Sequence, residues 1–599
     1  MGEDAIEGKQ NIVIIGAGPA GLTCAYELSK HGNTCVILES DHIVGGISRT
    51  VEYDGFRFDI GGHRFFTKVP YIQNIWREIL GEEFLTRQRK SRIFYNGRFF
   101  DYPLTYRNAL HNLGIAESVR IFASYLAAKG FPHRREDNFE QWVSNRFGKR
   151  LYEIFFKTYT EKVWGIPCDQ LSSHWAAQRI KNLSLSEALK NAIFNRSTDK
   201  SGEVITSLIE EFFYPRYGPG MIWQRCREKL EKNNSRVEPD HRVNRIYHEH
   251  LKIRGVQSVS NSGETFEHCV SHLINSMPLR HLIFALDPPP SDQVLKAASE
   301  LRYRDYFTVI LIINKPHIFE DNWLYIHSAD VLMGRVQNYK NWSPDMVPDA
   351  SKTSLGLEYF LWKDDPLWNK PDAELIQLGM SECVKIGLVA PEDILDGTLV
   401  RMEKAYPVYD AKYDDNLDII RNYLSSFENL QTIGRNGLHR YNNQDHSMLT
   451  GIYAARNLYG ATHNIWKVNT EKSYLEESER KDSADRLMED FLKQEFAYLD
   501  APALGISIAV VFAFLVFMVT LVAWLVHEKP LISALSLLNN YLVGYRVSPF
   551  GAVLGGIETG ILGFVLGYIF AGLRNLGIKL YAKRTKKYFE SLQHKDILS

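Results

Sequence analysis

Apolar and polar positions in the first forty residues follow the pattern of a strand, a helix and a second strand. Residues 10–18 (QNIVIIGAG) form a short apolar run, residues 18–32 (GPAGLTCAYELSKHG) carry apolar side chains at helical spacing, and residues 34–40 (TCVILES) form a second apolar run. Short apolar runs on either side of such a helix predict the opening unit of a doubly wound α/β sheet.

The pattern changes twice over the following 460 residues. Residues 107–200 carry apolar side chains at helical spacing and predict a helical region. From about 214 to 440 the pattern is mixed, and runs such as 306–315 (YFTVILIINK) and 353–362 (TSLGLEYFLW) predict strands. Residues 470–500 are rich in charge and predict a solvated amphipathic helix.

Two long apolar runs lie near the end of the chain. Residues 501–526 are 26 residues without a charge, more than the ~20 that cross a hydrocarbon core. Residues 549–573 hold a single acid, Glu558, and several glycines at the four-residue spacing that lets helices approach closely in lipid. The loop between the runs has two basic residues, whereas residues 574–587 have six. Two membrane spans with both chain ends in the cytoplasm are therefore predicted.

The overall composition is that of a globular protein, with 45% hydrophobic and 24% charged residues. Lys and Arg total 70 against 71 for Asp and Glu, so the basic excess typical of nucleic-acid binding is missing. The six cysteines are scattered without a CxxC pair. This usage indicates a reducing compartment and predicts neither a disulfide framework nor a metal site.

The turn after the first apolar run has the spacing of a dinucleotide-binding loop. Gly16, Gly18 and Gly21 form G-x-G-x-x-G at the strand-to-helix junction, where glycine permits a tight turn and close approach of a pyrophosphate to the helix N-terminus. Glu39 ends the second apolar run, where an acid accepts hydrogen bonds from a ribose. The ordered set of strand, turn, helix, strand and acid predicts a dinucleotide site.

A second glycine pair narrows the choice of dinucleotide. Gly45 and Gly46 follow the second strand and resemble the second glycine motif of FAD proteins of the amine-oxidase-like group, so FAD is favoured over NAD. The expected fold is α/β: a Rossmann-like FAD-binding domain with an inserted helical domain, a mixed β-sheet substrate domain and a C-terminal transmembrane helical hairpin. The expected boundaries are 1–106 for the first part of the FAD-binding domain, 107–213 for the helical substrate-cleft domain, 214–470 for the mixed sheet and the return to the FAD-binding domain, 471–500 for a linker helix, 501–575 for the two spans and 576–599 for a basic cytoplasmic tail.

From about residue 11 to 458 the chain resembles UDP-galactopyranose mutases, and it is closer to the eukaryotic pattern than to the usual bacterial one. Six stretches occur in the family's order: the FAD turn, GGHRFF, RKSRIFYNGRFFDYPL, YTEKVWGIPCDQLSSHWAAQRI, FYPRYGPGMIW with WLYIHSADVLMGRVQNYKNWSP, and AYPVYD followed by GRNGLHRYNNQDHS. The resemblance implies a flavoprotein of the superfamily that also contains amine oxidases and protoporphyrinogen oxidases. The two C-terminal apolar runs are not part of a typical mutase.

The resemblance implies a role for each matching residue. His63 lies against the flavin, and Arg179 and Arg335 clamp the substrate diphosphate; these three are the implied catalytic residues. Tyr406 and Tyr441 match tyrosines whose hydroxyls reach the same phosphates. A tyrosine there adds a hydrogen-bond donor without adding charge. The remaining implied substrate contacts are Tyr102, Trp164, Trp323 and Asn443, and the remaining implied cofactor contacts are Gly62, Arg435 and Gln444.

The implied reaction interconverts the pyranose and furanose forms of a diphosphate-linked sugar such as UDP-galactose, through attack of N5 of the reduced flavin on the anomeric carbon. FAD acts in its reduced form, without net redox change, and NAD(P)H is a candidate reductant. Leu104 and Thr105 stand where the family commonly has an aromatic residue and Gln, and Thr160 stands where the eukaryotic pattern has Asn. The diphosphate clamp is thus better kept than the nucleotide pocket, so both a nucleotide and a lipid carrier stay open.

The same fold also serves a second reaction class. The alternative is a FAD-dependent oxidoreductase, of the amine oxidase or desaturase kind, acting on a membrane lipid or a polyprenyl-linked substrate. The expected location is the cytoplasmic membrane, with the catalytic domain facing the cytoplasm. A diphosphate-linked sugar and membrane lipid are the expected partners, and glycosyltransferases of cell envelope polysaccharide synthesis and a second copy of the chain are further candidates.

Overall fold

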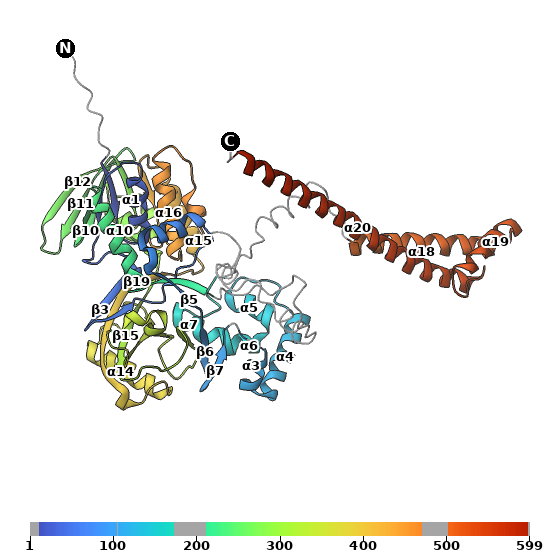
Figure 1. Ribbon diagram of the computed structural model, residues 1–599, viewed down its shortest axis with the longest axis horizontal. Helices are drawn as coiled ribbons and strands as arrows, with labels where there is room; N and C mark the ends of the chain where they lie inside the picture. The colour runs from blue at the N-terminus through green and yellow to red at the C-terminus, as the bar shows by residue number, and fades with distance from the viewer. Residues whose placement is uncertain (1–10, 103, 105, 173–210, 470–500, 597–599) are drawn as a thin grey trace, which may run out of the picture. The chain divides into compact units, whose positions relative to one another are not determined.

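The computed structural model describes residues 11–102, 104, 106–172, 211–469 and 501–596 of the chain. The chain divides into two compact units, Met1–Ser478 and Glu479–Ser599. The first unit holds the sheets and most of the helices, and the second holds a long helical hairpin (Figure 1). The expected α/β fold class is confirmed. The predicted helix over 470–500 lies outside the described residues.

A five-stranded parallel sheet carries the predicted dinucleotide turn. β1 (Ile12–Ile15) lies at its centre between β2 (Cys35–Leu38) and β13 (His272–Asn275). β9 (Arg236–Glu238) and β20 (Leu430–Thr432) form the two edges, so the sheet combines parts of the chain more than 400 residues apart. All four residues of β1 are buried, as an uninterrupted apolar run in a doubly covered sheet requires.

Three helices pack around this sheet. α1 (Pro19–Ser29) follows β1 and packs against α16 (Gln444–Asn457), with α10 (Gly220–Lys232) beside it. The contact between α1 and α16 is close enough to need glycine, because a Cβ at Gly451 would lie 2.3 Å from the carbonyl oxygen of Ala20. A four-stranded sheet extends from the β9 edge and consists of β10 (His241–Glu249), β11 (Lys252–Ser260), β12 (Thr265–Cys269) and β14 (Leu286–Asp287).

A mixed seven-stranded sheet forms the second large element of the first unit. Its order is β19-β15-β18-β17-β16-β6-β7, and the β16–β6 pair is parallel whereas the others are antiparallel. α14 (Asp372–Lys385) packs on one face, where a Cβ at Gly379 would lie 2.7 Å from Val309 Cγ1. The strands are β6 (Ser91–Tyr95), β7 (Arg98–Asp101), β15 (Tyr303–Ile313), β16 (Trp323–Ile326), β17 (Arg335–Asn338), β18 (Thr353–Leu361) and β19 (Ile394–Pro407).

A group of helices follows β7, as the sequence pattern predicts. Its members are α3 (Tyr106–Leu113), α4 (Ile115–Gly130), α5 (Phe139–Phe147), α6 (Lys149–Tyr152), a π-helical turn over Glu153–Lys157 and α7 (Thr158–Trp164). The smaller connecting elements are β3 (Thr50–Tyr53), β4 (Phe56–Asp59), α2 (Pro70–Leu80), β5 (Phe84–Gln88), β8 (Glu211–Pro215), α11 (Leu279–Ala285), α12 (Asp292–Glu300), α13 (Tyr339–Trp342) and α15 (Tyr413–Leu424).

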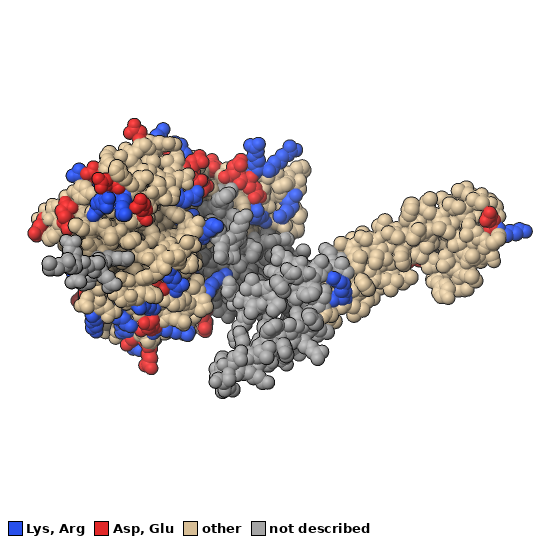
Figure 2. All heavy atoms as spheres, turned by 90° about the horizontal axis from the view of Figure 1, so that it is seen from above, with Lys and Arg blue, Asp and Glu red and all other residues tan. Residues whose placement is uncertain are grey.

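The second unit is a hairpin of α18 (Ala501–Val526) and α20 (Pro549–Asp596), with the short α19 (Lys529–Ser536) between them. Both long helices are long and apolar enough to cross a membrane, and only 11% and 28% of their most apolar stretches are buried, which distinguishes them from core helices. Charged side chains are sparse on the visible face of this hairpin, whereas they are spread over the first unit (Figure 2).

Glycines hold the two long helices together. A Cβ at Gly567 would lie 2.9 Å from Gly505 Cα, and a Cβ at Gly563 would lie 3.0 Å from the carbonyl oxygen of Ile508. Near the other end of the hairpin, the hydroxyls of Thr520 and Tyr545 share a buried hydrogen bond of 2.6 Å. The four-residue glycine spacing of α20 therefore serves the contact with α18.

Candidate active site

One large cavity of about 1220 Å³ lies in the first unit, among the described residues. Its wall combines the ends of the parallel strands, the inner face of the seven-stranded sheet and helices α5 to α7. Pockets for single small ligands have volumes of roughly 300–1,000 Å³, so this cavity has room for a dinucleotide and a second ligand side by side.

The two glycine motifs of the sequence meet at one end of this cavity. Gly16 has a φ of +98°, and a Cβ there would lie 2.2 Å from Ser276 Oγ. Gly18 begins α1, and a Cβ on it would come no closer than 4.0 Å to Gly46 Cα, so the space in front of the helix N-terminus is open. Gly45 supports this geometry from behind, because its N–H donates to the carbonyl of Ala17 at 2.8 Å. A helix N-terminus with free space in front of it is suited to a pyrophosphate.

Glu39 lies beside this open space at the end of β2. Its Oε2 accepts from the Ala17 N–H at 2.7 Å, and its Oε1 accepts from the Asp41 N–H at 3.0 Å and the Ser40 hydroxyl at 3.2 Å. Burial raises the pKa of the Glu39 carboxyl, and the backbone donors oppose this shift. The carboxylate is thus fixed by the turn that it closes and still lines the cavity, where ribose hydroxyls could donate to it.

Further polar atoms in the cavity wall have no hydrogen-bond partner among the residues that the structure describes. Both side-chain polar atoms of Gln444, at the start of α16, and Nε of Arg435 are buried without a hydrogen bond. Buried polar groups are rarely left unpaired in folded proteins, so these atoms point to a polar ligand. The open helix N-terminus, the fixed carboxylate and these unpaired groups fit a dinucleotide such as FAD.

The predicted cofactor residues separate into two groups. Gly21 and Gly45 stay behind the wall, and Gly21 is needed because a Cβ there would lie 2.0 Å from the carbonyl oxygen of Gly16. The others line the cavity: Gly16, Gly18, Glu39, Gly46, Gly62, Arg435 and Gln444.

His63 also lines this cavity. Its Nε2 lies 2.7 Å from the carbonyl oxygen of Ile60, so Nε2 carries the proton and donates. Burial lowers the pKa of His63 to about 4, and the nearby Arg435 and Arg335 add to the shift. The ring is therefore neutral at physiological pH.

Arg335 is placed in the same cavity by β17, with a partner that the sequence patterns did not indicate. Its Nε donates to Oε2 of Glu358 on the neighbouring strand β18 at 2.8 Å, and its Nη2 lies close to the same oxygen and 3.3 Å from the Tyr406 hydroxyl. Glu358 is fully buried and also accepts from Gln337 Nε2 at 2.9 Å. Burial disfavours the charge of Arg335, but Glu358 outweighs it and raises the pKa of the guanidinium.

Aromatic side chains lie beside Arg335 and beside a second arginine of the cavity, Arg435. The rings of Tyr406 and Tyr441 stack with centroids 5.5 Å apart, and Arg435 lies over Tyr441 at 4.0 Å. Trp164 meets both tyrosines edge-on at 6.1 and 6.3 Å. The structure thus brings the predicted residues Tyr102, Trp164, Trp323, Arg335, Tyr406, Tyr441 and Asn443 into the wall of one cavity. Arg179 lies outside the described residues.

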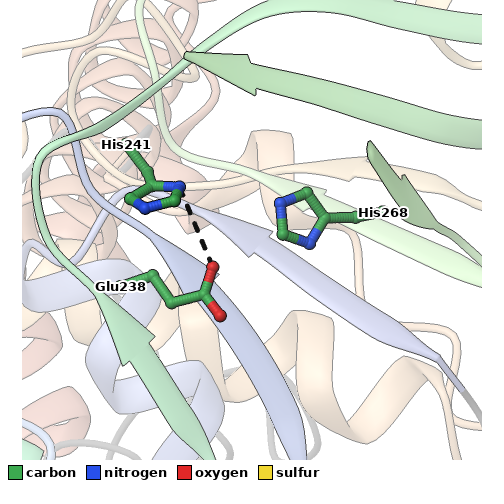
Figure 3. Close-up of side chains that lie close together, drawn as sticks. All are labelled: Glu238, His241 and His268. Atoms are coloured by element: carbon green, nitrogen blue, oxygen red, sulfur yellow. Dashed lines mark ion pairs between the residues drawn. The ribbon is translucent and has the colours of Figure 1, made fainter. Parts of the chain in front are cut away.

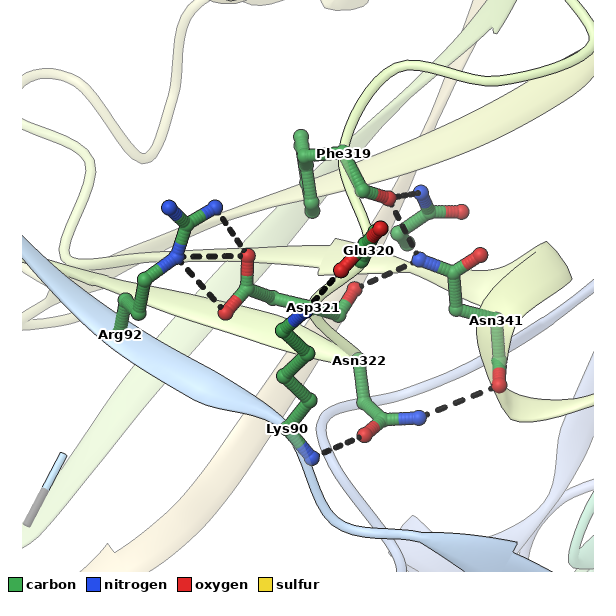
Figure 4. A network of polar contacts seen from close by, with 8 residues as sticks. Lys90, Arg92, Phe319, Glu320, Asp321, Asn322 and Asn341 are labelled. Carbon is green, nitrogen blue, oxygen red and sulfur yellow. Dashed lines mark hydrogen bonds and ion pairs between the residues drawn. The ribbon is translucent and has the colours of Figure 1, made fainter. Parts of the chain in front are cut away.

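Arg89 is a further cation beside the site that the sequence patterns did not indicate. On β6 and the residues before it, Lys90 and Arg92 point to one side, where they meet Glu320 and Asp321 (Figure 4). Arg89 alternates with them and lies over the rings of Tyr102 and Trp323, at 5.4 and 5.5 Å. Its Nε and Nη2 are buried and have no hydrogen bond to any residue in the described part of the chain. The period-two alternation of RKSRIFY was the available signal.

A group of possible metal ligands lies behind the dinucleotide end. Nitrogen and oxygen atoms of Glu238, His241 and His268 lie within 4.8 Å of one another (Figure 3). The Ser258 hydroxyl lies 3.2 Å from both His241 Nδ1 and His268 Nε2, and Arg236 lies 3.6 Å from Glu238. The hydroxyl can donate to one ring and accept from the other, so hydrogen bonds account for this group without a metal ion.

Comparisons with known proteins agree with a flavoprotein of Rossmann-like fold. Residues 14–79 match the NAD(P)-binding Rossmann-like domain family. Protoporphyrinogen oxidase 2 of Arabidopsis thaliana is 32% identical over 456 residues, 70% of this chain and 87% of that protein. The crystal structure of a reduced UDP-galactopyranose mutase has a TM-score of 0.67 and 26% identity, and the match covers 77% of this chain and 97% of that one. The chain belongs to the FAD-dependent oxidoreductase superfamily that includes these two enzymes.

Other curated relatives match over shorter stretches. A probable UDP-galactopyranose mutase of Klebsiella pneumoniae is 28% identical over 167 residues, 27% of this chain and 43% of that protein. The 15-cis-phytoene desaturase of Glycine max is 37% identical over 100 residues, which is 16% of this chain and 18% of the desaturase. The superfamily is common to these relatives, whereas their reactions differ.

Proposed function

We propose that this chain is a membrane-anchored, FAD-dependent mutase that interconverts the pyranose and furanose forms of a diphosphate-linked sugar, with UDP-galactose as the reference substrate. One observation carries the proposal. The open dinucleotide end and the cluster of Arg335, Arg435, Tyr406 and Tyr441 line a single cavity, with the neutral His63 also in its wall. A cation and hydroxyl cluster beside a flavin site is what a diphosphate leaving group needs.

The dinucleotide end would hold FAD. The N-terminus of α1 after Gly18 would take the pyrophosphate, and Glu39 would accept from a ribose hydroxyl. Gln444 and Arg435, which also line the cavity, would offer donors that have no partner among the described residues. When bound and reduced, FAD supplies the nucleophilic nitrogen for this chemistry.

The diphosphate would be held by charge and by hydroxyl donors. Arg335 is already neutralised by Glu358, so it contributes fixed N–H donors more than net charge. Arg435 has no carboxylate within ion-pair distance among the described residues, and it supplies the uncompensated positive charge. Tyr406 and Tyr441 present hydroxyls from one stacked pair. This set would stabilise negative charge on the departing diphosphate and orient it for return.

His63 would act without changing its protonation state near pH 7. Its Nε2 proton is held by Ile60, which fixes the plane of the ring. A neutral ring adds no charge beside Arg335 and Arg435, so it can contact the flavin and the sugar without competing with the anion for the cations.

The hairpin of α18 and α20 would anchor the enzyme in the cytoplasmic membrane, with the catalytic unit and the basic C-terminus in the cytoplasm. Its substrate would then meet the enzyme at the membrane surface, where glycosyltransferases of cell envelope polysaccharide synthesis could take the product. NAD(P)H is the proposed source of electrons for the initial reduction.

A FAD-dependent oxidoreductase is the second candidate function. The long match to protoporphyrinogen oxidase 2, which covers 87% of that protein, is the observation that favours it. In that case the cavity would bind a membrane lipid or a polyprenyl-linked molecule, and oxidised FAD would remove an electron pair in each turnover.

The two candidates differ in their need for reductant. The purified full chain, reconstituted with FAD, should convert UDP-galactofuranose to UDP-galactopyranose after dithionite reduction, without consuming reductant per turnover. Cyanoborohydride should leave extracted flavin heavier by one sugar. Arg335→Lys should lose most activity because ammonium lacks the planar fork. Arg401→Ala, which removes a surface ion pair with Asp372, is the matched control. Activity with oxidised flavin alone, together with a dehydrogenated lipid product, would reject the mutase.

A further inference from the structure

Helix α4 exposes an unusual number of large hydrophobic side chains. Eleven such side chains are exposed among residues 11–469 as described, and five of them lie between Ile115 and Phe131. Their exposed fractions are 77% for Ile115, 61% for Val119, 47% for Phe122, 53% for Leu126 and 89% for Phe131. Scattered exposed hydrophobic residues are common, but a contiguous group of this kind marks an interaction surface.

Four of the five exposed residues form a single stripe on one side of the helix, and Phe131 follows directly after its last residue. Ile115, Val119, Phe122 and Leu126 follow the spacing of four, three and four residues that places side chains on one face. The buried residues of α4, Ile121 and Tyr125, lie on the other face. That face packs on α5 and α6 at the margin of the helical group (Figure 1). The packed face is thus already used, and the apolar stripe is a second face without a partner among the described residues.

Basic residues outnumber acidic ones around the stripe. Arg120 is 71% exposed in its side chain, Lys129 is exposed in the last turn of the helix, and Arg134 and Arg135 are exposed just beyond it. Of the three acids between residues 115 and 137, Glu117 is only 18% exposed and is paired with Arg150 and Arg120, and Glu136 is paired with Arg146. The third, Asp137, is exposed. An apolar face flanked by Arg and Lys is the composition of helices that lie in the interface of an anionic bilayer.

We propose that the stripe Ile115, Val119, Phe122 and Leu126, together with Phe131, docks the catalytic unit onto the surface of an anionic membrane. The apolar side chains would enter the boundary between head groups and acyl chains, and the basic residues would contact lipid phosphates. A symmetric dimer through this face would bring like charges together, which opposes it. The proposal rests on the membrane location proposed above, since the hairpin of the same chain would supply the bilayer.

The position of α4 gives this docking a consequence for the active site. α5 and α6, on which α4 rests, carry Phe139, Phe147 and Leu151, and these side chains line the cavity. Docking would therefore place the helical wall of the cavity next to the lipid head groups.

Depth-dependent quenching tests the proposal on the full chain. Cys269 is the exposed cysteine among the six, so a Cys269→Ser background leaves five buried thiols. Phe122→Cys, labelled with NBD and reconstituted in phosphatidylcholine and phosphatidylglycerol vesicles, should lose more than half of its fluorescence when the lipids carry bromine on their acyl chains. Leu395→Cys, on β19 and 50% exposed, is the control outside the stripe and should keep its fluorescence. Arg134→Glu with Arg135→Glu should reduce the quenching at Phe122→Cys severalfold at low salt.

A third probe separates the failure of docking from the failure of anchoring. Val522→Cys lies in α18 and should be quenched if the hairpin is inserted. Quenching at 522 without quenching at 122 would overturn the docking proposal and leave the anchor standing. No quenching at either position would overturn both. A Phe122→Cys disulfide between two copies, or burial of that probe by residues 173–210 in lipid-free detergent, would also overturn it.

Discussion

Replacing Arg335 by Ala would leave a carboxylate stranded inside the protein. Glu358 is 0% exposed, and Arg335 is the one Lys or Arg within ion-pair distance of it among the described residues. Removing one partner of a buried pair costs about 3–5 kcal/mol, because the remaining charge keeps its desolvation cost without its counter-charge. Arg335→Ala should therefore destabilise the catalytic unit by about 3–5 kcal/mol, in addition to any loss of substrate affinity.

Denaturation by guanidinium chloride, followed by tryptophan fluorescence of the full chain in detergent, measures this cost. The double variant Arg335→Met with Glu358→Leu removes both charges and should recover most of the stability, since well-packed apolar residues replace buried ion pairs with little loss. It should still not bind the diphosphate. Arg401→Ala is the matched control, because its partly exposed pair with Asp372 should contribute at most about 1 kcal/mol.

The pattern of results distinguishes a structural arginine from a purely ligand-binding one. If Arg335→Ala unfolds at the same denaturant concentration as the parent protein, Glu358 is not held by Arg335 and the reasoning fails. The sequence alone leads to a different expectation, namely that Arg335→Ala removes substrate affinity and leaves FAD binding intact. The buried partner on β18 is the reason for the change.

Four further predictions concern the cofactor, acid stability and the hairpin. Glu39→Ala should weaken FAD binding by about 1.5–3 kcal/mol, measured by fluorescence titration, with Glu39→Gln less affected. Burial lowers the pKa of His327 to about 3, so this ring stays neutral in the folded protein. Below about pH 6.5 the unfolded chain takes up a proton at this residue, and the free energy of unfolding therefore falls as the pH falls. His327→Phe should remove about 1.4 kcal/mol per pH unit from that slope in denaturation midpoints compared at pH 6 and 5; an unchanged slope would refute it. Gly567→Leu should force α18 and α20 apart, because the added side chain meets Gly505. The double variant Ala513→Cys with Gly560→Cys should form a disulfide between the two helices, and adding Gly567→Leu should abolish that disulfide. Tags at both chain ends should resist protease added to sealed right-side-out cells, and digestion of either would reject the proposed topology.

The local features of the fold could be predicted because each depends on a short stretch of chain. The turn at Gly16 and Gly18 follows from glycine spacing between an apolar strand and a helix, and the structure has β1 and α1 there. The long helix over Ala501–Val526 follows from 26 residues without a charge. In both cases the chemistry of neighbouring residues determines the backbone.

The partners of the site residues depended on contacts across long separations. Nothing near Arg335 in the sequence marks Glu358, which faces it because β17 pairs with β18. The same holds for Arg89. Its neighbours Lys90 and Arg92 pair with Glu320 and Asp321, some 230 residues away, and Arg89 itself has no acidic partner among the described residues. The type of a charged residue shows that its burial requires a counter-charge, but it does not show which strand supplies that counter-charge.

The sequence by itself determined the fold class, the dinucleotide turn and the residue types that an anion site requires, because these follow from local periodicity and from the chemistry of single side chains. The tertiary structure decided which of those residues share a cavity and which charge is already neutralised. It also decided which face of α4 stays uncovered, since the sequence shows apolar residues around most of that helix and only packing against α5 and α6 selects Ile121 and Tyr125 as the buried ones. Burial is a property of the assembled elements, and so the free charges and the free surface of this protein appear only in three dimensions.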